Sequence, residues 1–239
     1  SKPELATTTL ARLVEVDPAL TAMVLRMANS PLFGFNGRVS SARQATVLLG
    51  TKTVGSLAVG GTASLVFGTL DAPVAPGAWG HTVAVACGAA AMARFDGVNP
   101  EEAFTAGLLH NAAMFVQAPN DPDPAGCENV GEGETCDDDD CLAGRSADLL
   151  RSWGLPSNLV RAVRQHAAPI AGVTDALSRT VVIGHALAPA VEEVAHKGRM
   201  TPREAFAATG LGANRFDEVV GTIRRDVDGI ATFLETESV

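Results

Sequence analysis

The chain has 239 residues, of which 46% are hydrophobic and 19% are charged, and its formal net charge is −9 at pH 7. This length and composition indicate a globular protein with a substantial core and exclude an intrinsically disordered chain. No uninterrupted apolar stretch approaches the roughly 20 residues that cross a bilayer. Because the N-terminus also lacks a basic-then-apolar leader, we expect a cytoplasmic protein without membrane contact.

The negative charge is concentrated in one segment, which we predict to be an acidic insertion loop over residues 119–141. It contains nine acidic residues and no lysine or arginine. Removing these nine from the 27 acids leaves 18, which equals the 18 lysines and arginines. The rest of the protein is therefore electrically balanced. Since it shows no basic stripe with interleaved aromatic residues, we expect no nucleic-acid partner.

Three of the four cysteines, Cys127, Cys136 and Cys141, lie in the same acidic segment. Their spacing lacks the C-x2-C pairs of structural zinc sites, so a solvated insertion is the favoured interpretation. A disulfide or an adventitious metal within the segment is the alternative. The fourth, Cys87, stands in an alanine-rich run and is predicted to be a small buried hydrophobic residue.

The predicted elements are helices almost throughout the chain. Three helix starts combine a side-chain acceptor at the N-cap with proline at the first helical position: Asp17-Pro18, Asn99-Pro100 and Thr201-Pro202. In the third, Glu204 completes a capping box. The first helix carries an apolar stripe at spacings of three and four, and it should end near Asn29, shortly before Pro31.

The sequence contains almost no strand signal, because each patch of β-branched residues lies within a longer run of helical periodicity. Proline and glycine in residues 71–77 mark the best internal boundary. We therefore predict one all-α domain over residues 1–239. It should consist of an N-terminal helical layer, 1–72, and a second helical unit, 76–239.

The histidines are the candidate ligands of this chain. Four of them, His81, His110, His166 and His185, fall on separate predicted helices, which suits a site built at the centre of a helical unit. The stretch 107–115, in which His110 stands next to Asn111, is predicted to lie inside one of these helices. His196 stands near basic residues late in a helix and is predicted to face solvent. Because a lone histidine on an apolar face is usually a hydrogen-bonded core residue, a purely structural role is the alternative.

Four stretches of the chain resemble the HDOD domains, which are regulatory relatives of the HD metal-dependent phosphohydrolases. They are VDPALTAMVLRMANSPLFG (16–34), ATVLLGTKTV (45–54), the histidine-containing region 81–114, and LLRSWGLPSNLVRAVRQH (149–166). The resemblance extends from about residue 4 to past residue 190. It implies an all-α fold in which an N-terminal helical bundle packs on an HD-like helical unit.

The resemblance also assigns positions in the metal site of the active HD enzymes, where a first histidine, a His-Asp doublet and a distal aspartate hold the metal. His81 resembles the first histidine, and His110 resembles the histidine of the doublet. Asn111 stands in the place of the doublet's aspartate, and His185 in the place of the distal aspartate. His166 resembles an additional ligand of the two-metal forms.

These replacements leave no carboxylate in the inferred ligand set. Such a set should bind Mg2+, Mn2+ or a di-iron centre weakly. Neutral imidazoles could still bind Zn2+ or Ni2+, and the residues that would supply them are His81, His110, His166 and His185. We therefore expect no cofactor, no bound metal and no catalytic residue. In this interpretation, the histidines and Asn111 form a buried polar network at the vestigial metal-site positions.

The resemblance implies a non-catalytic regulatory domain of bacterial signal transduction that acts through contact with other signalling proteins. The segments 28–30 and 153–156 are predicted to cap helices, and they could also shape a groove for such a partner. Two alternatives stay open. One is a metal-dependent phosphohydrolase with a histidine-rich centre, and the other is a sensor that binds a nucleotide second messenger without hydrolysing it.

Overall fold

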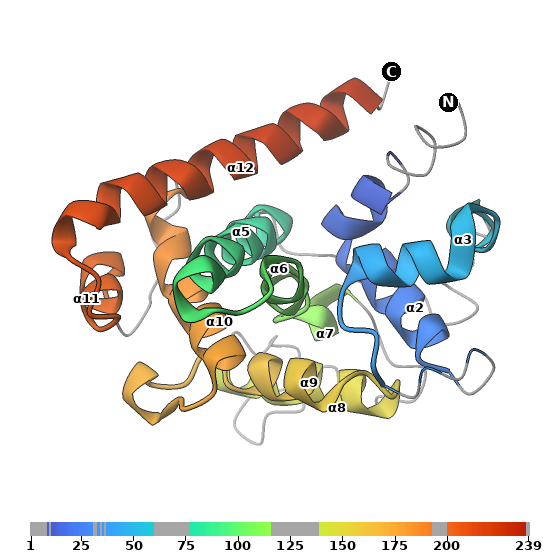
Figure 1. The fold of residues 1–239 in the computed structure, drawn as a ribbon, viewed down its shortest axis with the longest axis horizontal. Helices are drawn as coiled ribbons and strands as arrows, with labels where there is room; N and C mark the ends of the chain where they lie inside the picture. The colour runs from blue at the N-terminus through green and yellow to red at the C-terminus, as the bar shows by residue number, and fades with distance from the viewer. Residues whose placement is uncertain are drawn as a thin grey trace, which may run out of the picture.

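The computed structural model describes residues 9, 11–30, 33, 35, 37–59, 77–115, 139–192 and 200–237. Throughout these ranges the regular structure is helical and contains no strand, which confirms the predicted all-α fold. Figure 1 shows α2 (Pro18–Ala28) and α3 (Ala42–Val59) beside the other helices, with the long α12 (Phe216–Glu237) crossing above α5 (Ala78–Asp96). Within the same ranges, no helix is both long and apolar enough to span a membrane.

Helix α2 begins and ends where the sequence predicts. Residues 11–16 are helical, and the Asp17 carboxylate accepts hydrogen bonds from the backbone nitrogens of Ala19 and Leu20 at the start of α2. That helix ends with Asn29 as its C-cap. The Asn29 side chain donates to the carbonyls of Leu25 and Val39 and accepts from the Val39 nitrogen, at 2.9–3.0 Å. It thereby ties the end of α2 to the chain that leads into α3.

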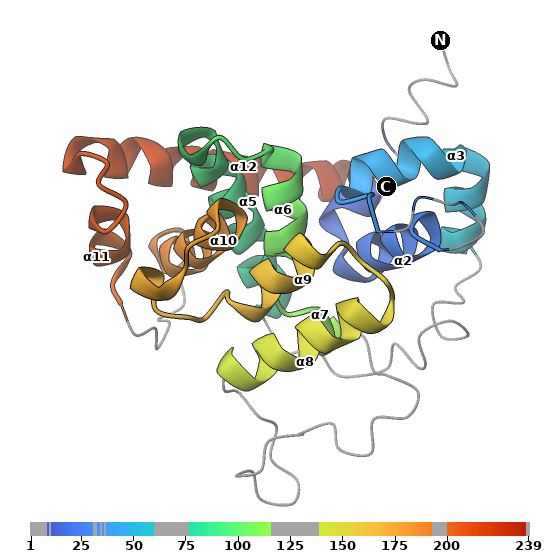
Figure 2. The same cartoon turned by 60° about the horizontal axis from the view of Figure 1, so that its bottom comes forward.

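Helix α5 lies at the centre of the second unit and packs against α6 (Pro100–Leu108), α10 (Ala176–Leu187) and α12. A helix that is apolar on every side is normally buried, and alanine and valine make up most of the buried residues of α5. Figure 2, which turns the view by 60°, shows α6 and α10 beside α5 from a second direction.

Two glycines set the spacing between these helices. A Cβ on Gly184 of α10 would lie 2.5 Å from the Ala89 nitrogen of α5, and one on Gly107 of α6 would lie 2.7 Å from the Ala86 Cα. Both distances are far below ordinary van der Waals contact, and both involve backbone atoms. The absence of a side chain at these positions therefore allows α6 and α10 to lie directly against α5.

Two helices flank the WGLP segment as predicted. Helix α8 (Asp139–Ser152) ends before Gly154, which adopts a φ of 70°, and α9 (Ser157–Arg164) begins directly after Pro156. The predicted acidic loop over 119–141 is wrong at its end, because residues from Asp139 onward are helical. Acidic residues favour the first turn of a helix, which explains how the acidic run continues into α8. Its remaining part, with Cys127 and Cys136, lies outside the described residues.

The other caps also agree with the sequence. The Asn99 side chain accepts from the Glu101 nitrogen at the start of α6, and Thr201 with Glu204 forms the predicted capping box of α11 (Pro202–Ala207). The remaining short elements are α7 (Ala112–Phe115), η1 (Ile170–Gly172), η2 (Ala188–Ala190) and η3 (Ala213–Arg215). Cys87 is 2% exposed within α5, which confirms it as a small core residue.

One hydrophobic cluster joins the N-terminal helices to the second unit. It includes Val14 and Leu25 from the N-terminal layer and Leu109, Leu159 and Val181 from the helices around α5. The predicted boundary near 71–77 lies almost entirely outside the described residues. The division into subregions 1–72 and 76–239 therefore stays a prediction.

Candidate functional site: a buried histidine cluster

The structure brings the four predicted histidines together. His81 lies in the first turn of α5 and His185 in the last turn of α10. The sequence predicted that His110 and His166 also lie within helices, and this is wrong. Both lie in turns: His110 follows α6, and His166 follows α9. His196 lies outside the described residues. The four side chains thus come from four separate segments of the chain.

The four rings form a compact group. The centroid of His81 lies 5.3 Å from that of His110 and 5.2 Å from that of His185. His166 lies 4.8 Å from His110 and 5.1 Å from His185, and the distance between His110 and His185 is 5.5 Å. One ring nitrogen from each of His81, His110 and His185 lies within 4.8 Å of the other two.

His110 and Asn111 occupy a break in the helical run that the sequence predicted to be continuous. Helix α6 ends at Leu108, and α7 begins only at Ala112. The Gly107 carbonyl oxygen accepts two hydrogen bonds from His110, one from its backbone nitrogen at 3.4 Å and one from its Nδ1 at 2.6 Å. This local competition for one carbonyl accounts for the break. His110 is fully buried and Asn111 is 5% exposed.

The hydrogen bonds determine which ring nitrogen carries a proton. A carbonyl oxygen only accepts, so the Nδ1 atoms that face Gly107 from His110 and Val163 from His166 must donate. In a neutral imidazole this leaves Nε2 with a lone pair. The Nε2 of His110 and the Oδ1 of Asn111 are buried and have no hydrogen-bond partner among the described residues. The centre of the cluster is therefore rich in acceptor atoms and poor in donors.

Glu192 is the site residue that sequence reasoning missed. Its Oε1 lies 2.8 Å from the Nδ1 of His81, and the two side chains are 15% and 16% exposed. The carboxylate therefore contacts the outer nitrogen of His81. The available signal was its position seven residues after His185, which is two helical turns. The 3₁₀ turn η2 lies between His185 and Glu192, and the sequence does not show which way the chain runs after this turn.

Burial holds the pKa of His110 well below its usual value of 6.5, and the neighbouring His166, His81 and His185 lower it further. His110 is therefore neutral in the folded protein at pH 7. The unfolded chain binds a proton at this residue below about pH 6.5, while the folded protein does not. Because the unfolded state then holds more protons, stability falls as the pH is lowered through this range.

We accordingly expect the metal-free protein to lose up to about 1.4 kcal/mol of unfolding free energy per pH unit below pH 6.5 on account of His110. Denaturant unfolding at pH 7.5, 6.5 and 5.5 in the presence of a chelator measures this slope. The variant His110→Gln should show a flatter dependence, whatever its stability at pH 7.5. Equal slopes in the two proteins would contradict the assignment to His110.

The residues present do not fit the metal chemistry of the carboxylate-containing HD site. Hard cations such as Mg2+ take oxygen ligands, and the described cluster offers a set of imidazole nitrogens, with Glu192 bonded to the outer side of His81. The Asn111 side chain carries no charge. Three or four imidazoles do suit a borderline ion such as Zn2+. The donor set therefore disfavours hard cations such as Mg2+ and is compatible with borderline ions such as Zn2+.

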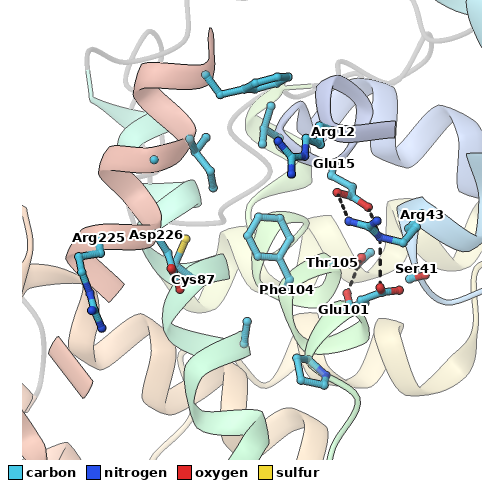
Figure 3. Close-up of a pocket in the computed structure, with 16 residues that line it drawn as sticks. Arg12, Glu15, Ser41, Arg43, Cys87, Glu101, Phe104, Thr105, Arg225 and Asp226 are labelled. Carbon is cyan, nitrogen blue, oxygen red and sulfur yellow. Dashed lines mark hydrogen bonds and ion pairs between the residues drawn. The ribbon is translucent and has the colours of Figure 1, made fainter. Parts of the chain in front are cut away.

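A second feature is a cavity of about 460 Å³ between the N-terminal layer, α5, α6 and α12. Figure 3 shows Arg43 between Glu15 and Glu101, with its Nε 3.0 Å and 3.1 Å from their carboxylates. Burial raises the pKa of Glu15 although Arg43 acts in the opposite direction. The charged residues of the described lining are three arginines and three acids. This lining therefore has no excess positive charge to hold a nucleotide phosphate.

A third feature is a groove of about 740 Å³ lined mainly by residues of the first and last of the four stretches that resemble the HDOD domains. Its lining comes from the end of α2 and the chain after it, and from residues 152–157 between α8 and α9. The Arg26 guanidinium lies over the Trp153 ring at 5.9 Å. Segments that are about 120 positions apart in the sequence thus meet at one surface.

Comparison with known proteins agrees with this architecture. The HDOD domain family matches residues 1–169, whereas we expect the resemblance to extend past residue 190, so His185 lies beyond the matched residues. The MmoQ response regulator from Methylococcus capsulatus str. Bath has a similar fold, with a TM-score of 0.62, 22% identity, and coverage of 92% of this chain and 95% of that one. A protein from Shewanella amazonensis SB2B named "Putative phosphohydrolase" has a TM-score of 0.50 and 21% identity, with coverage of 95% and 93%.

These identities show a shared fold alone, and a search of curated proteins found no match. The family match covers more than two thirds of the 239 residues. The chain belongs to the HDOD domain family.

Proposed function

We propose that this protein is a non-catalytic regulatory domain that acts through contact with another signalling protein. The observation that carries the proposal is the groove between the end of α2 and the connection from α8 to α9. Its lining mixes apolar and polar groups, with Trp153, Leu155 and Arg26 among them. Trp and Arg are enriched among the residues that dominate protein–protein binding energy.

The histidine cluster supports the non-catalytic part of this proposal. Hydrolysis of a phosphate ester by a metal enzyme needs an ion that activates water, and the active HD enzymes hold it with carboxylates. By the family resemblance, Asn111 and His185 stand in the places of those carboxylates in this chain. We expect no phosphate release from nucleotides or cyclic dinucleotides with Mg2+ or Mn2+.

Site-specific crosslinking tests the contact surface. A photo-crosslinking residue at the exposed Ser157, inside the groove, should capture one defined protein in cells of the organism of origin. The same residue at Glu218, which is exposed on α12, serves as the matched control. Capture at Ser157 should be lost with Trp153→Ala. Equal capture from both positions, or capture unaffected by Trp153→Ala, would contradict the proposed surface.

A metal-dependent phosphohydrolase is the second candidate, and the convergence of His81, His110 and His185 favours it. Its test is phosphate release in the presence of Zn2+ by the unmodified protein and by His110→Ala. A catalytic site predicts activity that is lost in the variant. A structural site predicts no activity in either protein and a lower unfolding free energy for His110→Ala.

A further inference from the structure

The ring nitrogens of His81, His110 and His185 form a compact donor set between three elements of the fold. One nitrogen from each residue lies within 4.8 Å of the others. His110 is fully buried, whereas His81 and His185 are half-buried. Solvent therefore does not reach the donor set at His110, whereas His81 and His185 are partly accessible to solvent.

Hydrogen bonds on the outer side of the cluster direct the electron pairs inward. The Nδ1 of His110 donates to the Gly107 carbonyl, and the Nδ1 of His81 faces the Glu192 carboxylate at 2.8 Å. An imidazole ring that coordinates an ion while its Nδ1 is engaged in this way does so through Nε2. For His110, this atom is buried and has no hydrogen-bond partner in the described part of the chain. A buried lone pair of this kind is satisfied by a cation that accepts it.

We propose that His81, His110 and His185 bind a divalent transition metal ion of the zinc class. Neutral imidazole is a preferred ligand of Zn2+, Cu2+ and Ni2+, whereas Mg2+ and Ca2+ require oxygen ligands. The set differs from the His-Asp site of the active relatives because no carboxylate coordinates the ion. This inference does not depend on the proposed regulatory function, because binding of the ion to these three histidines requires no partner protein.

The observed spacing requires a small contraction when the ion binds. Tetrahedral zinc with bonds of about 2.1 Å to nitrogen places its ligand atoms about 3.4 Å apart. The donor atoms of the cluster lie within 4.8 Å of one another, so they must approach by up to about 1.4 Å. We expect the half-buried His81 and His185 to make this adjustment, because His110 is fully buried and has no room to move.

Glu192 has the role of the carboxylate that orients a metal-binding histidine. Such residues fix the tautomer and direction of the ring and raise its basicity, and their loss costs about 10- to 100-fold in metal affinity. The 2.8 Å contact with the Nδ1 of His81 has the arrangement that this role requires. Glu192 is thus a positioning residue for His81 rather than a ligand.

The test measures Zn2+ binding directly and needs no enzyme activity. The full chain carries Cys127→Ser, Cys136→Ser and Cys141→Ser, so that thiolates of the acidic segment cannot bind the ion. The protein is stripped with a chelator, equilibrated with Zn2+ or Mg2+, and passed through a desalting column, and its metal content is measured by mass spectrometry. We expect one Zn2+ per chain, no retained Mg2+, and a rise in melting temperature with Zn2+ alone, because a ligand that binds only the folded state stabilises it.

Variants at half-buried positions then separate metal binding from folding. His81→Gln and His185→Gln should lose stoichiometric Zn2+ while their metal-free circular dichroism matches the parent. Glu192→Gln should weaken Zn2+ binding about 10- to 100-fold in competition with a chromophoric chelator. Glu218→Gln, at an exposed position of α12, is the matched control and should leave the affinity unchanged.

Three outcomes would overturn the proposal: no Zn2+ retained by the parent, equal retention of Mg2+, or Zn2+ affinity unaffected by His185→Gln. None of them bears on the crosslinking test of the groove. The failure of the metal site and the failure of the regulatory function are therefore distinguishable.

Discussion

Gly184→Ala is expected to lower the free energy of unfolding by about 3 kcal/mol, which is the upper end of the usual cost of overpacking, because the neighbouring atoms belong to the backbone. The new Cβ would lie 2.5 Å from the Ala89 nitrogen and 2.8 Å from the Val85 oxygen. These are backbone atoms of α5, so no side-chain rotation can relieve the clash. Helix α10 would have to move away from α5, and His185 would move with it. Chemical denaturation measures the loss of stability.

Gly221→Ala provides the matched control for this prediction. Gly221 lies in α12, and a Cβ at this position would meet nothing within 4 Å. Alanine has a higher helix propensity than glycine, so this variant should be more stable than the parent by up to about 1 kcal/mol. If the two variants changed stability by similar amounts, the close approach of α10 to α5 would be wrong.

Asn29→Ala is expected to lower the free energy of unfolding by about 2 to 3 kcal/mol, because buried backbone groups would lose their partners. The Asn29 side chain makes three hydrogen bonds, two of them with both backbone groups of Val39. Both residues are buried, so water cannot replace these bonds without rearrangement. The chain between α2 and α3 should loosen, and with it one wall of the groove.

The control for Asn29→Ala is another asparagine with a simpler environment. Asn158 is half-buried and donates to a Glu102 carboxylate oxygen at 2.6 Å. Asn158→Ala should cost about 1 kcal/mol, since a single partly exposed hydrogen bond is lost. Urea unfolding of both variants measures the difference. A cost for Asn29→Ala no larger than that for Asn158→Ala would show that the bonds to Val39 contribute little.

The family-related motifs of this chain therefore have two distinct physical roles. The Asn29 side chain makes its hydrogen bonds with backbone groups of the protein itself, and these bonds stabilise one wall of the groove. Ser157 and Trp153, on the opposite wall, present surface that a partner can contact. A loss of partner binding in Asn29→Ala would accompany a loss of stability, whereas Ser157→Arg, at an exposed position of the groove, should affect binding with little change in stability. Comparing the two variants separates the support of the groove from the contact surface.

The sequence by itself determined the helical fold and the starts of α2, α6 and α11. Asp17, Asn99 and Thr201 cap the predicted helices, and Gly154 ends a helix where the pattern indicated. These features depend on interactions within about four residues, so the local sequence contains the information needed. The family resemblance likewise named the four histidines that the structure brings together.

Only the tertiary structure decided the chemistry of the cluster. The break at His110 arises because its ring takes the Gly107 carbonyl, and Glu192 reaches His81 from a segment 111 residues away. The distance between α5 and α10 depends on Gly184, whose importance appears only when Ala89 lies against it. Such contacts depend on how packed helices are spaced and turned relative to one another. A pattern of nearby residues predicts a helix, but it does not fix which atoms of distant helices will meet.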